Sequence, residues 1–235
     1  MRPYFCFMDE LEAIEDEVVA CRKCSRLVAW REAVAENPPK RFQGCDYWAK
    51  PVPAFGDANA RIIIVGLAPG AHGSNRTGRM FTGDNSGVFL FASLHRCGLA
   101  NQAQSSTRTD SLQLNDCLIT AAARCAPPDN KPLPEELRNC RPYLLRELKT
   151  LTQLRILVGL GKIGFDAAFD AAREVGLTSL KARPRFAHGV EAQLNVHLTL
   201  LGTFHPSQQN TFTGRLTAPM MDAVFQRARD LTKED

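Results

Sequence analysis

Four short apolar runs recur along the chain, and each has the length of a buried β-strand rather than of a helix. They cover residues 61–65 (RIIIV), 117–123 (CLITAAA), 155–160 (RILVGL) and 196–204 (VHLTLLGTF). Strands that alternate apolar and polar residues expose one face, whereas continuous apolar runs are typical of parallel strands that are covered on both faces. The pattern therefore predicts four strands of a mainly parallel sheet that is buried on both faces.

Helical patterns separate these runs. The first spans residues 9–35, where apolar side chains recur on one side, and it stops at an Asn-Pro-Pro sequence. Strands that alternate with helices predict an α/β fold in three layers, with the sheet between two layers of helices. We expect one domain over residues 1–235. The other predicted helices cover residues 86–96, 134–148, 163–174 and 218–231.

Composition narrows the class of protein only slightly. The chain has 235 residues, of which 44% are hydrophobic, and its net charge of +4 permits a polyanionic partner without demonstrating one. No apolar run approaches membrane-spanning length, and acidic residues follow the first eight residues at once, which excludes a secretion signal. We therefore expect a cytoplasmic monomer that has no membrane partner.

A glycine-rich loop follows the first predicted strand, at residues 66–84 (GLAPGAHGSNRTGRMFTGD). Open α/β sheets bind their ligands at the carboxyl ends of the strands, where such a loop lies. Glycines let the backbone approach a ligand closely, Arg76 and Arg79 suit phosphate, and Phe81 offers a flat apolar face. This glycine loop is the best candidate for a ligand site.

Two common phosphate-binding motifs do not fit the chain. Gly66, Gly70 and Gly73 lack the GxGxxG spacing of a dinucleotide site. Residues 158–164 (VGLGKIG) carry an isoleucine where a phosphate loop needs Ser or Thr for magnesium, so they predict a tight strand-to-helix turn instead.

Three polar residues lie near the same predicted sheet edge. His205 follows the fourth strand in the sequence FHPS, so it and the glycine loop are predicted to meet over one ligand. His72, inside the loop, either contacts that ligand or braces the backbone. Asp84 is placed to cap the helix at residues 86–96.

Eight cysteines are many for a cytoplasmic chain, and they point to metal or redox chemistry before disulfides. Cys21 and Cys24 form a CxxC pair, and Cys125 and Cys140 flank a proline-rich turn. Four thiolates that converge would hold zinc or an iron–sulfur cluster, and the residues alone do not separate these two. The alternative is four unrelated buried thiols. The other cysteines are expected to be core residues (Cys97 and Cys117) or incidental (Cys6 and Cys45).

Three segments together resemble the uracil-DNA glycosylase superfamily: GLAPGAHGSNRTGRMFTGDNSG, AARCAPPDNKP and HPS. They are most similar to its family 5, whose members carry an iron–sulfur cluster, and the resemblance runs from Cys21 to the last helix. It implies excision of uracil from DNA. It also implies a structural 4Fe-4S cluster on Cys21, Cys24, Cys125 and Cys140, which ties down the N-terminal helix.

The chain departs from the best-known members of the superfamily at the first motif. They place Asp or Asn there to hold the attacking water, whereas this chain has Leu67 and Ala68. The family 5 pattern implies that Asp84 holds the water and that Asn130 reads the edge of the base. Because Ala68 is small, we expect a wider base range that includes hypoxanthine.

The resemblance and the residue chemistry together give a full set of expected roles. A metal-stapled DNA-binding module without catalysis is the alternative, and the joint presence of an acid, an amide and a histidine argues against it. Phe212 or Leu216 is expected to fill the gap that a flipped base leaves. The predicted catalytic residues are Asp84, His205 and Asn130; the base pocket comprises Gly66, Leu67, Ala68, Gly70, Phe81 and Asn130; and the DNA contacts are His72, Ser74, Asn75, Arg76, Ser207 and Arg215.

Overall fold

The computed structural model describes residues 5–233, with side chains from residue 10 onward. Six strands form one sheet in the order β1-β3-β2-β4-β6-β5. The four inner strands are parallel, and β1 and β5 pair antiparallel at the two edges. The strands are β1 (Phe55–Gly56), β2 (Ile62–Gly66), β3 (Cys117–Ala121), β4 (Ile156–Leu160), β5 (Glu191–Asn195) and β6 (Leu198–Thr203).

The four predicted strands are thus confirmed as the parallel centre of a mainly parallel sheet, but the sheet has six strands, because β1 and β5, which the sequence did not predict, extend it at the edges. β1 has two residues and lies in a proline-rich segment, so it carries no strand pattern. β5 (EAQLN) is half-exposed at the sheet edge and carries polar residues. Edge strands that pack on few neighbours do not need the continuous apolar run that marks a central parallel strand.

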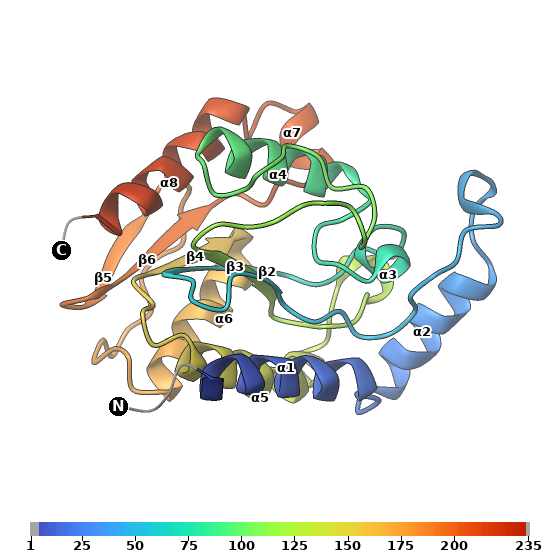
Figure 1. Cartoon of the computed structure of the whole chain (residues 1–235), viewed down its shortest axis with the longest axis horizontal. Helices are drawn as coiled ribbons and strands as arrows, with labels where there is room; N and C mark the ends of the chain where they lie inside the picture. The colour runs from blue at the N-terminus through green and yellow to red at the C-terminus, as the bar shows by residue number, and fades with distance from the viewer. Residues whose placement is uncertain (1–4, 234–235) are drawn as a thin grey trace.

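Helices cover both faces of the sheet, which confirms the three-layer architecture (Figure 1). One layer contains α4 (Asn85–Arg96) and α8 (Ala218–Leu231), and the other contains α1 (Phe5–Ala20), α5 (Pro134–Thr150) and α6 (Gly161–Glu174). Shorter elements lie at the ends of the sheet: α2 (Ser25–Glu36), α3 (Ser74–Thr77), α7 (Gln208–Phe212) and the 3-10 turns η1 (Lys40–Phe42) and η2 (Pro128–Asn130).

Strand β2 shows why its sequence does not alternate. Ile62 and Ile64 pack into the core beneath α4 and α8, whereas Ile63 and Val65 pack into the core beneath α1, α5 and α6. All four side chains are fully buried. Burying such a side chain contributes roughly 1.5–3 kcal/mol, so both faces of the strand stabilise the fold.

The predicted N-terminal helix at residues 9–35 is two helices. α1 ends at Ala20, α2 begins at Ser25, and the CxxC pair occupies the connection, where Cys24 has an extended backbone. α1 packs against α5, and Arg146 of α5 forms ion pairs with Glu10 and Glu17 of α1. α2 instead extends from the end of the sheet (Figure 1). One straight helix could not direct its apolar side to both places.

The tight turn predicted at residues 158–164 is confirmed. α6 begins at Gly161, directly after β4, and Gly161 has a φ of +74°, which glycine adopts without strain. A Cβ at Gly164 would stand 2.2 Å from the Val65 carbonyl oxygen, so this glycine permits close packing of α6 on β2. Within residues 5–233, no helix combines the length and hydropathy needed to cross a membrane.

Candidate functional site

A cavity of about 710 Å³ opens at the carboxyl ends of β2 and β6, with the glycine loop (residues 66–84) as its main wall. The loop after β6 and the turn η2 complete the wall. The structure therefore brings together segments that are more than 100 residues apart in the chain. Predicted site residues that line the cavity are Leu67, Ala68, Gly70, His72, Ser74, Phe81, Asp84, Asn130, His205 and Ser207.

Asp84 caps α4 and faces the cavity at the same time. Its Oδ1 accepts a hydrogen bond from the Gly87 amide at 3.0 Å, as the capping prediction requires. Its Oδ2 packs against the backbone of Gly70 and Gly73, where a Cβ would come within 2.9 and 2.0 Å. Burial raises the pKa of Asp84, and hydrogen bonds from the Ser86 and Gly87 amides oppose this rise.

Phe81 is held in an unusual backbone conformation. Its φ of 52° lies in the left-handed region, which side-chain-bearing residues adopt at a cost and mostly near functional sites. A Cβ at Gly66 would stand 3.0 Å from the Phe81 ring, so Gly66 makes room for the ring although it does not itself line the cavity. The ring centroid lies 5.9 Å from that of His205.

His205 follows β6 and turns its ring into the same cavity. Burial lowers its pKa to about 4, because a charged imidazolium would lose its hydration there. The ring is therefore neutral at physiological pH and has one N–H to donate. Asn210 Nδ2 donates a hydrogen bond to the His205 carbonyl at 2.8 Å and fixes the backbone at this point.

Asn130 reaches the cavity from η2, between β3 and α5. Both Asp129 and Asn130 have left-handed backbones, with φ values of 53° and 55°. Asn and Asp tolerate this region better than other side-chain-bearing residues do, which explains the Asp-Asn sequence at the tip of the turn.

His72 lies where either of the two roles that the sequence left open is available to it. It lines the cavity, and its Nδ1 lies 2.9 Å from the Tyr47 hydroxyl. Burial lowers its pKa, as do the charges of Arg41 and Arg76. Arg76 Nε in turn donates to the His72 carbonyl at 2.9 Å, and its Nη2 donates to the Gly83 carbonyl at 3.1 Å. Arg76 therefore braces the glycine loop from inside.

Four side chains with predicted DNA roles are buried, and these expectations require correction. Ser74 is only 2% exposed, although it lines the cavity. Arg79 forms an ion pair with Asp110 inside the protein and does not face phosphate. Asn75 has no exposed surface, so it does not present an amide to DNA. Leu216 is also buried, which leaves the exposed Phe212 as the available wedge. The glycine loop thus uses part of its polar content for its own structure.

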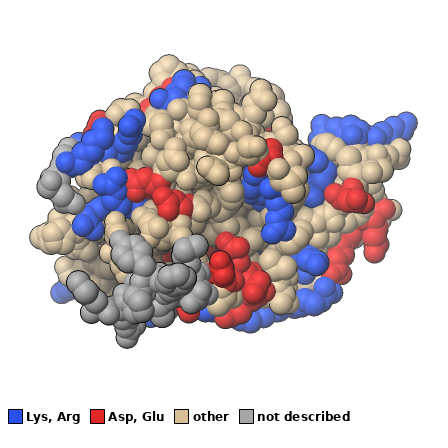
Figure 2. Space-filling view, viewed as in Figure 1, with Lys and Arg blue, Asp and Glu red and all other residues tan. Residues whose placement is uncertain are grey.

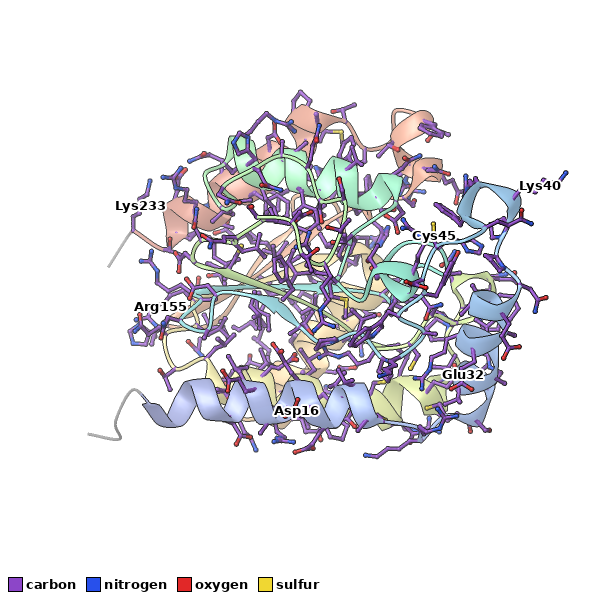
Figure 3. The ribbon with its side chains drawn as sticks, turned by 45° about the vertical axis from the view of Figure 1, so that its right-hand side comes forward. Asp16, Glu32, Lys40, Cys45, Arg155 and Lys233 are labelled. Atoms are coloured by element: carbon purple, nitrogen blue, oxygen red, sulfur yellow. The ribbon has the colours of Figure 1, made fainter. Side chains whose placement is uncertain are left out.

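Sequence reasoning missed one wall of the cavity. Arg41 and Phe42 line it from η1, which lies on an arm (residues 37–47) between α2 and β1. Figure 2 shows basic side chains along the upper edge of this arm and acidic side chains below it, over α1 and α2. In Figure 3, Lys40 extends from the arm into solvent. The neighbouring basic and aromatic residues Arg41 and Phe42 were the sequence signal that could have identified this wall.

Arg215, like Asn75 and Arg76, lies outside the cavity wall. It is exposed, and its guanidinium stacks over the Phe204 ring at 4.7 Å. It stands shortly after α7, whose last residue is the exposed Phe212. A phosphate contact there remains a prediction.

Cys21, Cys24, Cys125 and Cys140 line one narrow cavity between α2, α5 and the segment after β3, and we call them the four-cysteine centre. The structure thus places the two pairs around one cavity, and their role as metal ligands stays a prediction. Among the described residues, no group of three or more His, Cys, Asp or Glu side chains is arranged to hold a metal ion.

A buried cation accompanies the four-cysteine centre. Arg31 Nη1 donates to Cys125 Sγ at 2.9 Å, and the Arg31 side chain is 1% exposed. No carboxylate forms an ion pair with it within the described part of the chain. Because an isolated buried charge is costly, this arrangement fits sulfur ligands that carry negative charge in a metal–thiolate group.

The remaining cysteines have no such surroundings. Cys97 and Cys117 are buried in the core, as expected, and burial raises the pKa of both thiols. Cys45 is exposed on the arm. The side chain of Cys6 lies outside the described residues.

The fold and the cavity correspond to a known family, and the chain belongs to it. The family model described as "Uracil DNA glycosylase superfamily" matches residues 53–229. This range includes all six strands of the sheet and every segment of the cavity wall except the arm.

Named relatives narrow the comparison within that superfamily. The type-5 uracil-DNA glycosylase of Thermus thermophilus is 49% identical over 220 residues, which are 94% of this chain and 97% of the relative. The type-5 enzyme of Mycobacterium leprae is 48% identical over 216 residues, 92% of this chain and 93% of the relative. A type-4 uracil-DNA glycosylase of Sulfurisphaera tokodaii is 30% identical over 201 residues, 85% of this chain and 76% of the relative.

Proposed function

We propose that this chain is a type-5 uracil-DNA glycosylase, which hydrolyses the N-glycosidic bond of uracil in DNA and leaves an abasic site. One observation carries the proposal beyond the family: a single cavity contains an aromatic face at Phe81, an amide at Asn130, a carboxylate at Asp84 and a neutral imidazole at His205. These groups suit, in turn, the face of a flipped base, its polar edge, the sugar, and the uracil oxygen on which negative charge develops as the base leaves.

Recognition begins when the target nucleotide leaves the duplex, which costs a few kcal/mol in lost pairing and stacking. Phe81 then stacks on the flipped ring, and Asn130 hydrogen-bonds to its polar edge. The backbone at Leu67, Ala68 and Gly70 adds contacts along the cavity wall. Support comes from the position of all these residues around the same space.

Bond cleavage leaves positive charge on the sugar and negative charge on uracil. His205, neutral because of burial, donates a hydrogen bond to the uracil oxygen that gains charge. Asp84 orients the attacking water and stabilises the sugar cation through space. Its burial strengthens the electrostatic effect, because water screens the carboxylate less.

DNA is held by contacts that do not depend on sequence. Ser207 lines the cavity, and Arg215 lies exposed outside its wall, so both are placed to contact phosphate. Phe212 would enter the duplex and occupy the gap left by the flipped base. Its 77% exposure supports this role, because the fold itself does not use the side chain.

A 4Fe-4S cluster is proposed at the four-cysteine centre. Cys21, Cys24, Cys125 and Cys140 would hold it, and bound there it would serve as a structural staple. The buried Arg31 cation beside Cys125 supports a negatively charged metal–thiolate group at this place. A colourless protein that contains zinc would contradict this assignment.

The proposed range of bases extends beyond uracil. Ala68 projects no bulky side chain into the cavity, and the cavity volume of about 710 Å³ leaves room for the larger ring of hypoxanthine. The test uses duplexes that carry uracil, hypoxanthine or thymine at one position, followed by alkaline cleavage of abasic sites. We expect strand breaks at uracil and hypoxanthine and none at thymine, and breaks at uracil alone would restrict the range.

A metal-stapled DNA-binding module without catalysis is the alternative, and DNA binding without abasic product would favour it. A single domain over residues 1–235, a monomeric state and a cytoplasmic location stay predictions. Size-exclusion chromatography with light scattering tests the second of these, with one chain per particle as the expected result.

A further inference from the structure

We propose that Arg31 and Asn75 connect the four-cysteine centre to the glycine loop, so that the metal-loaded centre keeps the loop in the shape that the cavity needs. Both are positioning residues, since neither lines the cavity. The proposal rests on the proposed function only in taking the four cysteines as metal ligands.

The first half of the connection is the Arg31 side chain on α2. Its Nη1 donates to Cys125 Sγ at 2.9 Å, and its Nη2 donates to the Cys21 carbonyl at 3.5 Å. Arg124, a second buried arginine beside the centre, differs because it forms a buried ion pair with Glu147. The position of the Arg31 guanidinium therefore depends on the four-cysteine centre itself.

The second half is the Arg31 main chain. Its carbonyl accepts a hydrogen bond from Asn75 Nδ2 at 3.3 Å, and the same nitrogen donates to the Ala71 carbonyl at 3.4 Å. The backbone N–H of Asn75 donates to the Gly70 carbonyl at 3.1 Å, and the backbone carbonyl of Asn75 accepts from the backbone N–H of Ala49 at 3.0 Å. Asn75 thus joins α2, the glycine loop and the segment before β1, and it is 0% exposed.

This connection reaches the carboxylate of the site. Asn75 lies two residues after Gly73 and is hydrogen-bonded to Gly70, and these two glycines form the backbone surface on which the Asp84 carboxylate packs. A shift of Asn75 would move that surface. Removal of the metal would release Cys21 and Cys125 from their fixed positions, and α2 with the Arg31 carbonyl would then no longer hold Asn75 in place.

The test measures hydrogen–deuterium exchange of the amides at residues 70–78. It compares the wild type with Arg31→Met, Arg31→Lys and Asn75→Ala. Glu32→Gln is the matched control, because Glu32 is the next residue on α2 and its carboxylate forms an ion pair with the exposed Arg22. Iron, zinc and sulfide contents are measured for every variant before exchange.

We expect several-fold faster exchange at residues 70–78 in Arg31→Met and in Asn75→Ala, with Arg31→Lys between them and the wild type, and no change in Glu32→Gln. Asn75→Ala keeps the metal content of the wild type. Metal removal speeds the same amides in the wild type and adds little in Asn75→Ala, because the connection is already broken.

Unchanged exchange at residues 70–78 in Asn75→Ala would overturn the proposal, and so would an equal response of that variant and the wild type to metal removal. If Arg31→Met loses the protection of β2 and β4 and so fails to fold, Asn75→Ala alone decides. A wild type that binds no metal overturns both the centre and the connection. Absence of uracil excision, in contrast, contradicts the proposed function and leaves the exchange result standing.

Discussion

The carboxylate of Asp84 packs directly on the backbone of Gly73, with no space for a side chain between them: a Cβ there would stand 2.0 Å from Oδ2 and 2.7 Å from Cγ. Gly73 therefore does more than make the loop flexible. It sets the position of the group that we propose holds the attacking water.

Gly73→Ala should displace that carboxylate and lower the single-turnover rate of uracil excision by about tenfold or more, since small misplacements of a reacting group are costly. Gly70→Ala is the graded comparison, because its Cβ would stand 2.9 Å from Oδ2 and requires a smaller shift. Equal rates in Gly73→Ala and the wild type would show that the carboxylate position does not matter.

Asp84→Asn separates capping from catalysis. Asn is as good an N-cap as Asp, so α4 should keep its first turn. Burial raises the pKa of Asp84, which means that its ionised form is disfavoured in the fold. The Asp84→Asn protein should therefore melt at the same temperature as the wild type or higher. Excision should nevertheless fall by roughly 10²–10⁴-fold with DNA binding kept. Calorimetry, binding and single-turnover assays on one preparation measure all three.

The same shift gives a pH dependence. Because the pKa of Asp84 is raised, its carboxylate gains a proton at a higher pH than an ordinary aspartate does. The single-turnover rate should therefore decline on acidification sooner than an unperturbed aspartate would allow. A rate that stays constant down to the ordinary range of Asp would argue against an ionised Asp84 in the reaction.

His205 links stability to pH with a defined sign. Its pKa is lowered from 6.5 to about 4 by burial, so the unfolded chain takes up a proton below about pH 6.5 and the folded chain does so only near pH 4. The free energy of unfolding should therefore decrease as the pH falls from 6.5 to 4. His205→Asn lacks this contribution, so denaturant titrations should show the wild type losing stability relative to the variant over that interval. Parallel curves would contradict the lowered pKa.

Phe212 and Leu216 provide a paired test of the wedge. Phe212→Ala should change stability by less than about 0.5 kcal/mol, because the side chain is exposed. It should slow excision from duplex DNA more than from single strands, where no gap forms. Leu216→Ala should instead destabilise the fold by about 2–5 kcal/mol, since this side chain is buried. The reverse pattern would make Leu216 the wedge.

The contrast between central and edge strands shows what the sequence contains. Ile63 and Val65 pack on one side of β2 and Ile64 on the other, so burial on both faces leaves an apolar run that a reader can recognise. β5 lies half-exposed at the edge of the sheet and needs no such run, and β1 is too short to show a pattern. The centre of the sheet was therefore predictable and its edges were not.

The candidate site divides in the same way. Asp84, Phe81, Asn130 and His205 follow strands or stand in recognisable motifs, and they do meet in one cavity. Asn75 was misassigned because an amide in a polar loop looks the same in sequence whether it faces water or α2. Its burial depends on the path of a helix 40 residues earlier in the chain, which composition and spacing do not specify.

The most direct test of the central claim is single-turnover incubation of the wild type and Asp84→Asn with the same uracil-containing duplex, followed by alkaline cleavage. The account predicts a strand break at uracil with the wild type and little or none with the variant, although both bind the duplex equally. Binding by the wild type without any break, or equal cleavage by the two proteins, would contradict it.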